Sequence, residues 1–247
     1  MALYDRIGVG YAKHRRPDPR VAAQLHAGLG DARTILNVGA GAGSYEPADR
    51  VVIAVEPSLT MIAQRADGAP PAVQATAENL PFADGAFDAA LAIFTVHHWS
   101  DGRAGLAEVR RVVSGPVVVL TWEPEVGHDF WMVEDYVPAS TTIDDDMLNP
   151  AEILSGLGGG TSDVLPVPHD CVDGFYAAYW RRPEAYLDPG VRAAISGLAR
   201  LDPREVKQAM ARLAADLADG TWRRRHSHLL ELDEYDAGLR VVVSPGR

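Results

Sequence analysis

The chain has 247 residues, of which 47% are hydrophobic, so it is long enough to bury one sizeable core in a single domain. Acidic residues outnumber Lys and Arg by 34 to 23, a net charge of −11 that argues against a nucleic-acid partner, and no apolar run reaches the about 20 residues of a membrane span. The single cysteine, Cys171, excludes an internal disulfide and a cysteine-rich metal site, so no bound metal is predicted. The first residues do not resemble a signal peptide, and the sequence therefore predicts a cytoplasmic protein.

The first part of the chain predicts an alternation of helices and buried strands. A helix over 21–29, in which apolar residues recur at helical spacing, precedes an apolar strand over 34–38 and a second strand over 51–55. Ser58 is typical of a helix N-cap, and the helix that it begins is expected to run to residue 65.

The alternation continues to residue 122. Two consecutive prolines precede a short third strand near 73–75, and an almost wholly apolar fourth strand is predicted over 89–94. A helix over 101–113 leads into a fifth strand over 117–122. Strands and helices that alternate in this way predict a parallel sheet covered by helices on both faces.

After residue 122 the alternation stops. A short helix over 150–158 ends at three consecutive glycines, and a sixth strand is expected near 164–167. The segment 173–230 predicts several helices separated by prolines, and the last strand is predicted over 239–243.

The turn after the first strand carries the clearest functional signal. Its glycines, Gly39, Gly41 and Gly43, allow backbone conformations closed to other residues and let the chain approach a ligand closely. Glu56 follows the second strand, 17 positions after Gly39, where α/β nucleotide-binding folds place the carboxylate that accepts the two ribose hydroxyls. Turns also use glycines for other reasons, but the glycines and Glu56 together predict a ligand that contains a ribose.

Several sequence blocks share one pattern. They are the glycine turn NVGAGAG, the segment VEPSLTMIAQR, the runs ATAENLPF and FDAALAIFTVHHW, and the fifth strand VVVLTW. With these blocks, which cover about residues 35–122, the chain resembles the class I S-adenosylmethionine (SAM) dependent methyltransferases, of the small-molecule branch similar to the ubiquinone and menaquinone biosynthesis enzymes.

The resemblance implies a single domain over 1–247. Its sheet would be Rossmann-like and seven-stranded, mostly parallel with an antiparallel last strand. An N-terminal cap is expected over 1–30, and a helical lid over about 173–230 would be inserted before the last strand. The alternative for the insertion is extra packing on the sheet edge.

The resemblance also implies which residues contact the cofactor, SAM. The turn residues Gly39, Ala40 and Gly41 would face its methionine and ribose part, and Glu56 would accept the ribose hydroxyls. Asn37 stands where family members often have an acidic residue, two positions before the first glycine. Its amide can accept from the SAM ammonium but contributes no charge.

The adenine is expected between the segments that follow the second and third strands. Pro57 and Met61 would flank the ring, although Met61 is also a candidate for helix core. A backbone N–H at Ala77 or Glu78 would meet the ring, and Thr76 stands where family members frequently have Asp.

A pair of histidines leaves the fourth strand near the expected site of transfer. The run from Phe94 to His98 would lie beneath the transferring methyl group, and in related enzymes a histidine of such a run is assigned as a general base, for which an imidazole is suited by its pKa near neutrality. We predict His97 as the catalytic base. Because His97 and His98 are adjacent, they cannot both face the site in an extended segment. The alternative is structural, with one ring bonded to backbone and the other packed.

Two outer segments are expected to complete the site. Tyr11, and less strongly Tyr4, would close the cofactor pocket from the N-terminal cap, where Arg15 or Arg16 would meet the SAM carboxylate. Polar and aromatic side chains near the start of the insertion are candidates for an acceptor pocket or for core packing, and they are His169, Asp170, Asp173, Phe175, Tyr176, Tyr179 and Trp180.

The chemistry implied is an in-line displacement of a methyl group from a sulfonium. Such a step needs alignment and exclusion of water, not a metal or a nucleophilic side chain. The sequence therefore predicts methyl transfer from SAM to a small-molecule acceptor. The rival hypotheses are a SAM-binding protein without methyl transfer, with other chemistry or a regulatory or scaffolding role, and a nicotinamide-dependent dehydrogenase. The acceptor, the methylated atom and the oligomeric state are left open.

Overall fold

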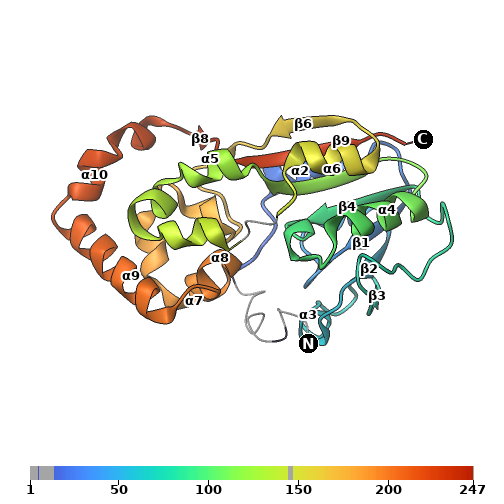
Figure 1. Cartoon of the computed structure of the whole chain (residues 1–247), viewed down its shortest axis with the longest axis horizontal. Coiled ribbons are helices and arrows are strands. Elements are labelled where there is room, and N and C mark those ends of the chain that lie inside the picture. The colour runs from blue at the N-terminus through green and yellow to red at the C-terminus, as the bar shows by residue number, and fades with distance from the viewer. Residues whose placement is uncertain (1–4, 6–13, 144–146, 247) are drawn as a thin grey trace.

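The computed structural model describes residues 5, 14–143 and 147–246, which form a sheet with a group of helices beside it (Figure 1). The strands of this sheet are β1 Thr34–Val38, β2 Val51–Val55, β3 Ala72–Val73, β4 Ala89–Ile93, β5 Val117–Trp122, β6 Thr161–Val164 and β9 Leu239–Ser244. They lie in the order β3-β2-β1-β4-β5-β9-β6. The first five run parallel, and β9 is antiparallel to both of its neighbours. The predicted seven-stranded, mostly parallel sheet with an antiparallel last strand is confirmed.

The sixth strand is present, but it covers Thr161–Val164 and not the predicted 164–167. β6 ends at Val164, and the chain then leaves the sheet, so that β7 (Val167–Pro168) pairs with β8 (Glu234–Tyr235) in a separate two-stranded sheet. Pro166 stands between the two strands. Because proline has no N–H to donate to a sheet ladder, the chain changes its pairing partner at this point.

Helices cover both faces of the main sheet, and the alternation of side chains along each strand decides which core they join. Val118 of β5 packs in one apolar cluster with α2 (Pro19–Gly28). Val119, its neighbour, packs in a second cluster with α4 (Gly102–Val112) and α6 (Pro150–Leu157). Successive residues of a strand point to opposite faces, so both must be apolar where both faces are covered.

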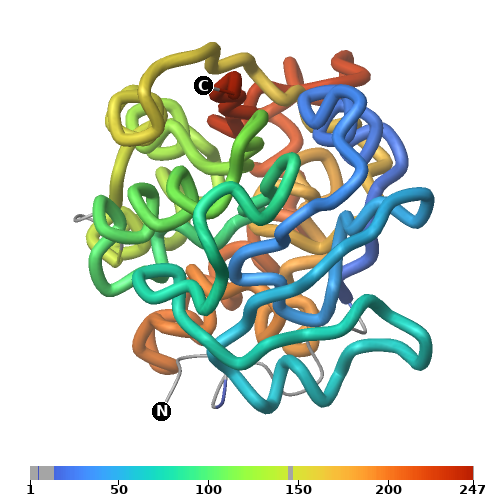
Figure 2. Tube along the Cα trace, turned by 90° about the vertical axis from the view of Figure 1, so that its right-hand side faces the viewer, coloured from blue at the N-terminus to red at the C-terminus, as the bar shows by residue number. Residues whose placement is uncertain are grey.

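Apart from α3 (Leu59–Ile62) and the 3-10 helix Val96–His98, the remaining helices form a group that we call the helical unit, made of residues 124–142 and 176–231. It contains most of the segment 173–230 that was predicted as an insertion, together with a segment directly after β5. Its elements are α5 Pro124–His128, the π-helix Met132–Tyr136, α7 Pro189–Ala193, α8 Ser196–Ala199, α9 Pro203–Ala218, α10 Thr221–Arg225 and the 3-10 helices Pro138–Thr142, Tyr176–Tyr179, Pro183–Leu187 and Ser227–Glu231. The unit lies to the left of the sheet in Figure 1, and from the sheet side its orange chain lies behind the strands (Figure 2). Within the described ranges, none of the helices is long and apolar enough to span a membrane.

The helical unit shares its core with the sheet. Leu120 of β5 belongs to the same apolar cluster as Trp131 and Trp180 of the unit. The indole Nε1 of Trp131 donates to the backbone carbonyl of Trp180 at 2.8 Å, and the Trp131 ring lies 5.3 Å from that of Trp222. Burial of such large aromatic side chains against strands of the sheet holds the unit in place.

We expect one glycine of α4 to be required by packing. A Cβ on Gly105 would lie 2.4 Å from Cε3 of Trp99, which is closer than van der Waals contact allows. Gly105→Ala should therefore lower the free energy of unfolding by about 1–3 kcal/mol, although alanine favours helices. Gly127→Ala in α5 is the matched control, because nothing lies within 4 Å of its Cβ position, and it should raise stability by about 0.5–1 kcal/mol. Urea unfolding of both variants checks this, and equal effects of the two changes would contradict the described packing.

Candidate cofactor and acceptor site

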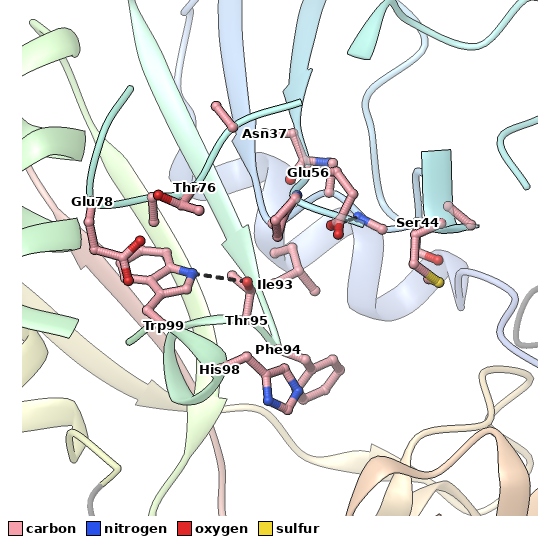
Figure 3. A pocket seen from close by; sticks show the side chains of 18 of the residues that line it. Asn37, Ser44, Glu56, Thr76, Glu78, Ile93, Phe94, Thr95, His98 and Trp99 are labelled. Atoms are coloured by element: carbon pink, nitrogen blue, oxygen red, sulfur yellow. Dashed lines mark hydrogen bonds between the residues drawn. The ribbon is translucent and has the colours of Figure 1, made fainter. Parts of the chain in front are cut away.

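The carboxyl ends of the parallel strands meet at one edge of the sheet and enclose a cavity of about 260 Å³ (Figure 3). Most of the residues that line it belong to the ends of β1, β2, β3 and β4 or to the segments that follow them, and Arg15 joins them from the part of the chain before α2. They include every predicted cofactor contact among the described residues, namely Asn37, Gly39, Ala40, Gly41, Glu56, Pro57, Met61, Ala77, Glu78 and Phe94. Tyr11 and Tyr4 lie outside the described residues.

The glycine turn presses against the end of β4. Gly39 has φ +66°, and a Cβ on it would lie 1.8 Å from Oγ1 of Thr95. Gly41 has φ +53°, and its Cβ position is 3.3 Å from the methyl group of Met61. Gly39 is therefore required because a side chain would collide with Thr95, and Gly41 is required by its backbone conformation.

Glu56 is buried with its carboxylate fixed by backbone donors. Its two oxygens accept from the N–H groups of Gly41 and Ser58, both at 2.8 Å. The side chain is only 5% exposed, and burial raises the pKa of the Glu56 carboxyl above its usual value. Each carboxylate oxygen keeps a further lone pair for a ligand that can donate hydrogen bonds.

The far end of the cavity is shaped by a tryptophan that sequence reasoning did not assign to the site. The Nε1 of Trp99 donates to Oγ1 of Thr95 at 3.1 Å, which fixes the indole at the cavity wall (Figure 3). Glu78 uses its carboxylate to accept from the backbone N–H groups of Ser100 at 2.7 Å and Asp101 at 3.1 Å. In the run TVHHW the sequence predicted roles only for the two histidines, although Thr95 and Trp99 also line the cavity.

The two histidines after β4 face different spaces. Residues Val96–His98 form a 3-10 turn and not an extended segment. His98 lines the larger cavity, whereas His97 lines a second, smaller one. Burial, with a contribution from the charge of Arg200, lowers the pKa of His97 to about 4. The ring is therefore neutral at neutral pH, and its buried Nδ1 has no hydrogen-bond partner among the described residues.

The second cavity, of about 60 Å³, lies between the sheet edge and the helical unit, and aromatic side chains dominate it. Its lining residues are Arg15, Phe94, His97, Trp122, Phe175, Tyr176 and residues 194–197. Phe94 is the wall between the two cavities, because it lines both, and it does so with a φ of +51°. Its ring centroid lies 5.7 Å from that of Trp122 and 5.4 Å from that of Phe175.

A buried cluster of polar side chains lies beside the two cavities. Arg15, which also lines both cavities, donates to both carboxylate oxygens of Asp173 at 2.7 and 3.2 Å. The Tyr45 hydroxyl donates to the same carboxylate at 2.7 Å, and the guanidinium of Arg15 lies 5.5 Å from the centre of the Phe94 ring. The charge of Arg15 is thus compensated within the protein.

The candidate residues at the start of the insertion divide accordingly. Phe175 and Tyr176 line the second cavity. Trp180 belongs to the core, with its Nε1 donating to the Val167 carbonyl, and Asp170 pairs with Arg20 at the surface.

The comparisons with known proteins agree with this geometry. Residues 36–116 match the family described as "Methyltransferase domain". A solved structure described as a putative methyltransferase from an antibiotic biosynthesis pathway of Anabaena variabilis is 31% identical, with a TM-score of 0.88, and the alignment covers 94% of this chain and 98% of that one. The chain belongs to the methyltransferase family. The family assignment therefore holds across the helical unit, and not only across the residues that match the family model.

Two further similarities are weaker. The Escherichia coli protein YafE, which is uncharacterized, is 40% identical over 130 residues, which cover 47% of this chain and 58% of that relative's length. The [4+2]-cyclase SpnF is 18% identical with a TM-score of 0.56, over 99% of this chain and 93% of that one, a likeness of fold alone.

We expect Glu56→Gln to weaken SAM binding tenfold or more, because the variant loses the charged acceptor for hydroxyl donors while keeping the side-chain shape. Isothermal titration calorimetry with SAM measures the effect. Glu78→Gln is the control from the same cavity, since that carboxylate is engaged by the backbone of residues 100 and 101, and it should change the affinity less than threefold. An unchanged dissociation constant for Glu56→Gln would count against Glu56 as a ribose contact.

The lowered pKa of His97 predicts a pH effect on stability. The unfolded chain takes up the proton near the ordinary pKa of 6.5, whereas the folded chain does so only near pH 4. His97 therefore lowers the free energy of unfolding as the pH falls through this range, and His97→Gln should lose less stability there than the parent. NMR of the imidazole nitrogens, assigned with the same variant, should show a neutral ring at pH 6. A midpoint near 6.5 would contradict the described burial.

Proposed function

We propose that this chain transfers a methyl group from SAM to a small-molecule acceptor, with SAM in the larger cavity and the acceptor in the smaller one. The observation that carries the proposal is the shared wall, since Phe94 and Arg15 line both cavities. Two ligands bound on either side of such a wall would be close neighbours at its edge. Proximity and alignment are the main requirements of methyl transfer.

The larger cavity has donors and acceptors that suit SAM. Glu56 has free lone pairs for the ribose hydroxyls, Asn37 presents an amide, and Pro57, Met61 and Trp99 provide apolar surface for a purine ring. When bound, SAM supplies a methyl group on a positively charged sulfur that is already a good leaving group. The positive φ values at Gly39 and Gly41 let the backbone lie close to such a ligand.

The smaller cavity suits an acceptor with an apolar or aromatic part. Trp122, Phe175 and Tyr176 supply aromatic walls, and residues 194–197 of the helical unit close the opposite side. We interpret the unit as the lid over the acceptor. Its walls would exclude water from the transfer site.

His97 is the candidate base for an acceptor whose proton must leave. It lines the smaller cavity and is neutral at neutral pH, so it can take up a proton there. Its low pKa makes it a weak base, which suits an acceptor whose proton becomes acidic only as the bond to carbon forms. His98 lines the SAM cavity and is the candidate for a cofactor contact.

The alternative is a SAM-binding protein without methyl transfer. Likeness of fold does not separate the two, since the cyclase SpnF shares the fold over its length. Calorimetry with SAM, followed by transfer of a radiolabelled methyl group to a panel of small molecules, distinguishes them. Binding without transfer to any tested acceptor would favour the alternative, and absence of SAM binding would contradict both.

With an acceptor in hand, we expect His97→Gln to lower kcat by about 10²- to 10⁴-fold while the SAM dissociation constant stays unchanged. The matched variant, His98→Gln, should instead weaken SAM binding, because the neighbouring ring lines the other cavity. Because the pKa of His97 is about 4, its ring stays unprotonated between pH 8 and pH 6. The rate of the parent should therefore not fall over this range through protonation of the base. Near-full activity of His97→Gln would return His97 to a structural role.

A further inference from the structure

Asn37, the residue two positions before the glycine turn, is buried at the floor of the larger cavity. It is 1% exposed and lines the cavity near the turn (Figure 3). Its amide nitrogen donates to a carboxylate oxygen of Glu46 at 3.0 Å. Glu46 lies nine residues further along the chain, beyond the turn, and sequence reasoning did not single it out.

Glu46 is held from its other side by Arg65. The Nη2 of Arg65 donates to the two carboxylate oxygens of Glu46 at 3.0 and 2.8 Å, and to the Pro70 carbonyl at 3.0 Å. Both charged side chains are only 6% exposed. Hydrogen bonds from neighbouring groups help to stabilise a buried ion pair, and Asn37 supplies one to Glu46, whereas Nε and Nη1 of Arg65 have no partner among the described residues.

This pairing decides which way the Asn37 amide points. A carboxylate in an ion pair only accepts hydrogen bonds, so the amide nitrogen must face Glu46. The reversed amide would place two acceptor oxygens about 3.0 Å apart, which is unfavourable. The carbonyl oxygen Oδ1 of Asn37 must therefore face away from Glu46.

The oxygen so oriented is available to a ligand. The side-chain hydrogen bond that Asn37 makes within the described residues is the one to Glu46, and its Oδ1 is not fully enclosed by protein atoms. A carbonyl oxygen that borders a cavity can accept a hydrogen bond from a donor bound there. The space into which Asn37 opens is the larger cavity.

We propose that Glu46 is a positioning residue that holds the carbonyl oxygen of Asn37 toward the cavity, where it accepts from the ammonium group of SAM. This inference rests on the proposed function, in which SAM occupies that cavity. Family members often carry a negative charge at position 37. In this chain the nearby charge is the carboxylate of Glu46, which is hydrogen-bonded to the Asn37 amide. Glu46 would orient the acceptor and Arg65 would hold Glu46 in place.

The third glycine of the turn fits the same arrangement. Gly43 has φ +95°, and a Cβ on it would lie 3.0 Å from the carboxylate of Glu46 and 3.1 Å from Nη1 of Arg65. Because Gly43 has no side chain, the ion pair of Glu46 and Arg65 can pack against the turn at this position.

Binding of two related ligands tests the positioning role. 5′-Methylthioadenosine has the adenosine and sulfur of SAM but no amino acid part. Glu46→Gln should raise the dissociation constant of SAM tenfold or more, because the amide of Asn37 is no longer forced into one orientation, and should change that of 5′-methylthioadenosine less than threefold. Equal losses for both ligands, or none for SAM, would overturn the inference.

A charge exchange keeps the test decisive if Glu46→Gln folds poorly. Asn37→Asp alone would set two carboxylates about 3.0 Å apart and should lower the melting temperature. The double variant Asn37→Asp/Glu46→Gln restores one carboxylate and one amide in exchanged positions, and it should bind SAM within threefold of the parent. A double variant that binds SAM tenfold or more weakly than the parent would overturn the positioning role. A parent chain that binds neither ligand would overturn the proposed function as well.

Discussion

The contact between the glycine turn and the end of β4 is the constraint on which the site depends. Gly39 lies so close to Thr95 that no side chain fits between them. This contact sets the segments after β1 and β4 against each other, and Glu56, which follows β2, is joined to the glycine turn by accepting from the N–H of Gly41. Packing of the backbone at this point therefore shapes the cavity.

Phe94 shows how the same edge of the sheet serves two spaces. Its positive φ is unusual for a residue with a bulky side chain, and such conformations persist only where the surroundings hold them in place. Here the rings of Trp122 and Phe175 lie against it on the side of the smaller cavity. Phe94 directly follows β4 and leads into the turn from which His97 and His98 face different cavities.

The sheet could be predicted closely where the sequence is locally decisive. The bounds of β1, β2 and β5 agree with the predicted ones because each is an apolar run that ends at a glycine or an acidic residue. The sixth strand could not be placed, because both sides of Pro166 are apolar and pairing with β9 or β8 depends on distant residues.

The site divides in the same way. Positions next to the turn and to Glu56 follow from spacing along the chain, and the structure brings them together around one cavity, although their contacts with SAM stay predictions. The 3-10 turn after β4 could not be foreseen from an assumed extended run, and the ion pair of Glu46 and Arg65 depends on two residues that are adjacent only in space. The segment 124–142 gave no clear signal because its elements are short and its middle part, residues 130–137, is held by burial in the shared core.

The cluster around Asp173 joins three distant parts of the chain, since Arg15 precedes the sheet, Tyr45 ends the glycine turn and Asp173 leads into the helical unit. Asp173 is the shared acceptor, so Arg15 and Tyr45 both lose this carboxylate if the segment that carries Asp173 departs. Opening of the helical unit would therefore release the turn that borders the larger cavity. By thermodynamic linkage, a ligand that binds only the closed arrangement must stabilise the helical unit by the same free energy by which the unit strengthens binding of that ligand. Substitutions deep in the unit, far from either cavity, are thus coupled to ligand affinity through the population of the closed arrangement.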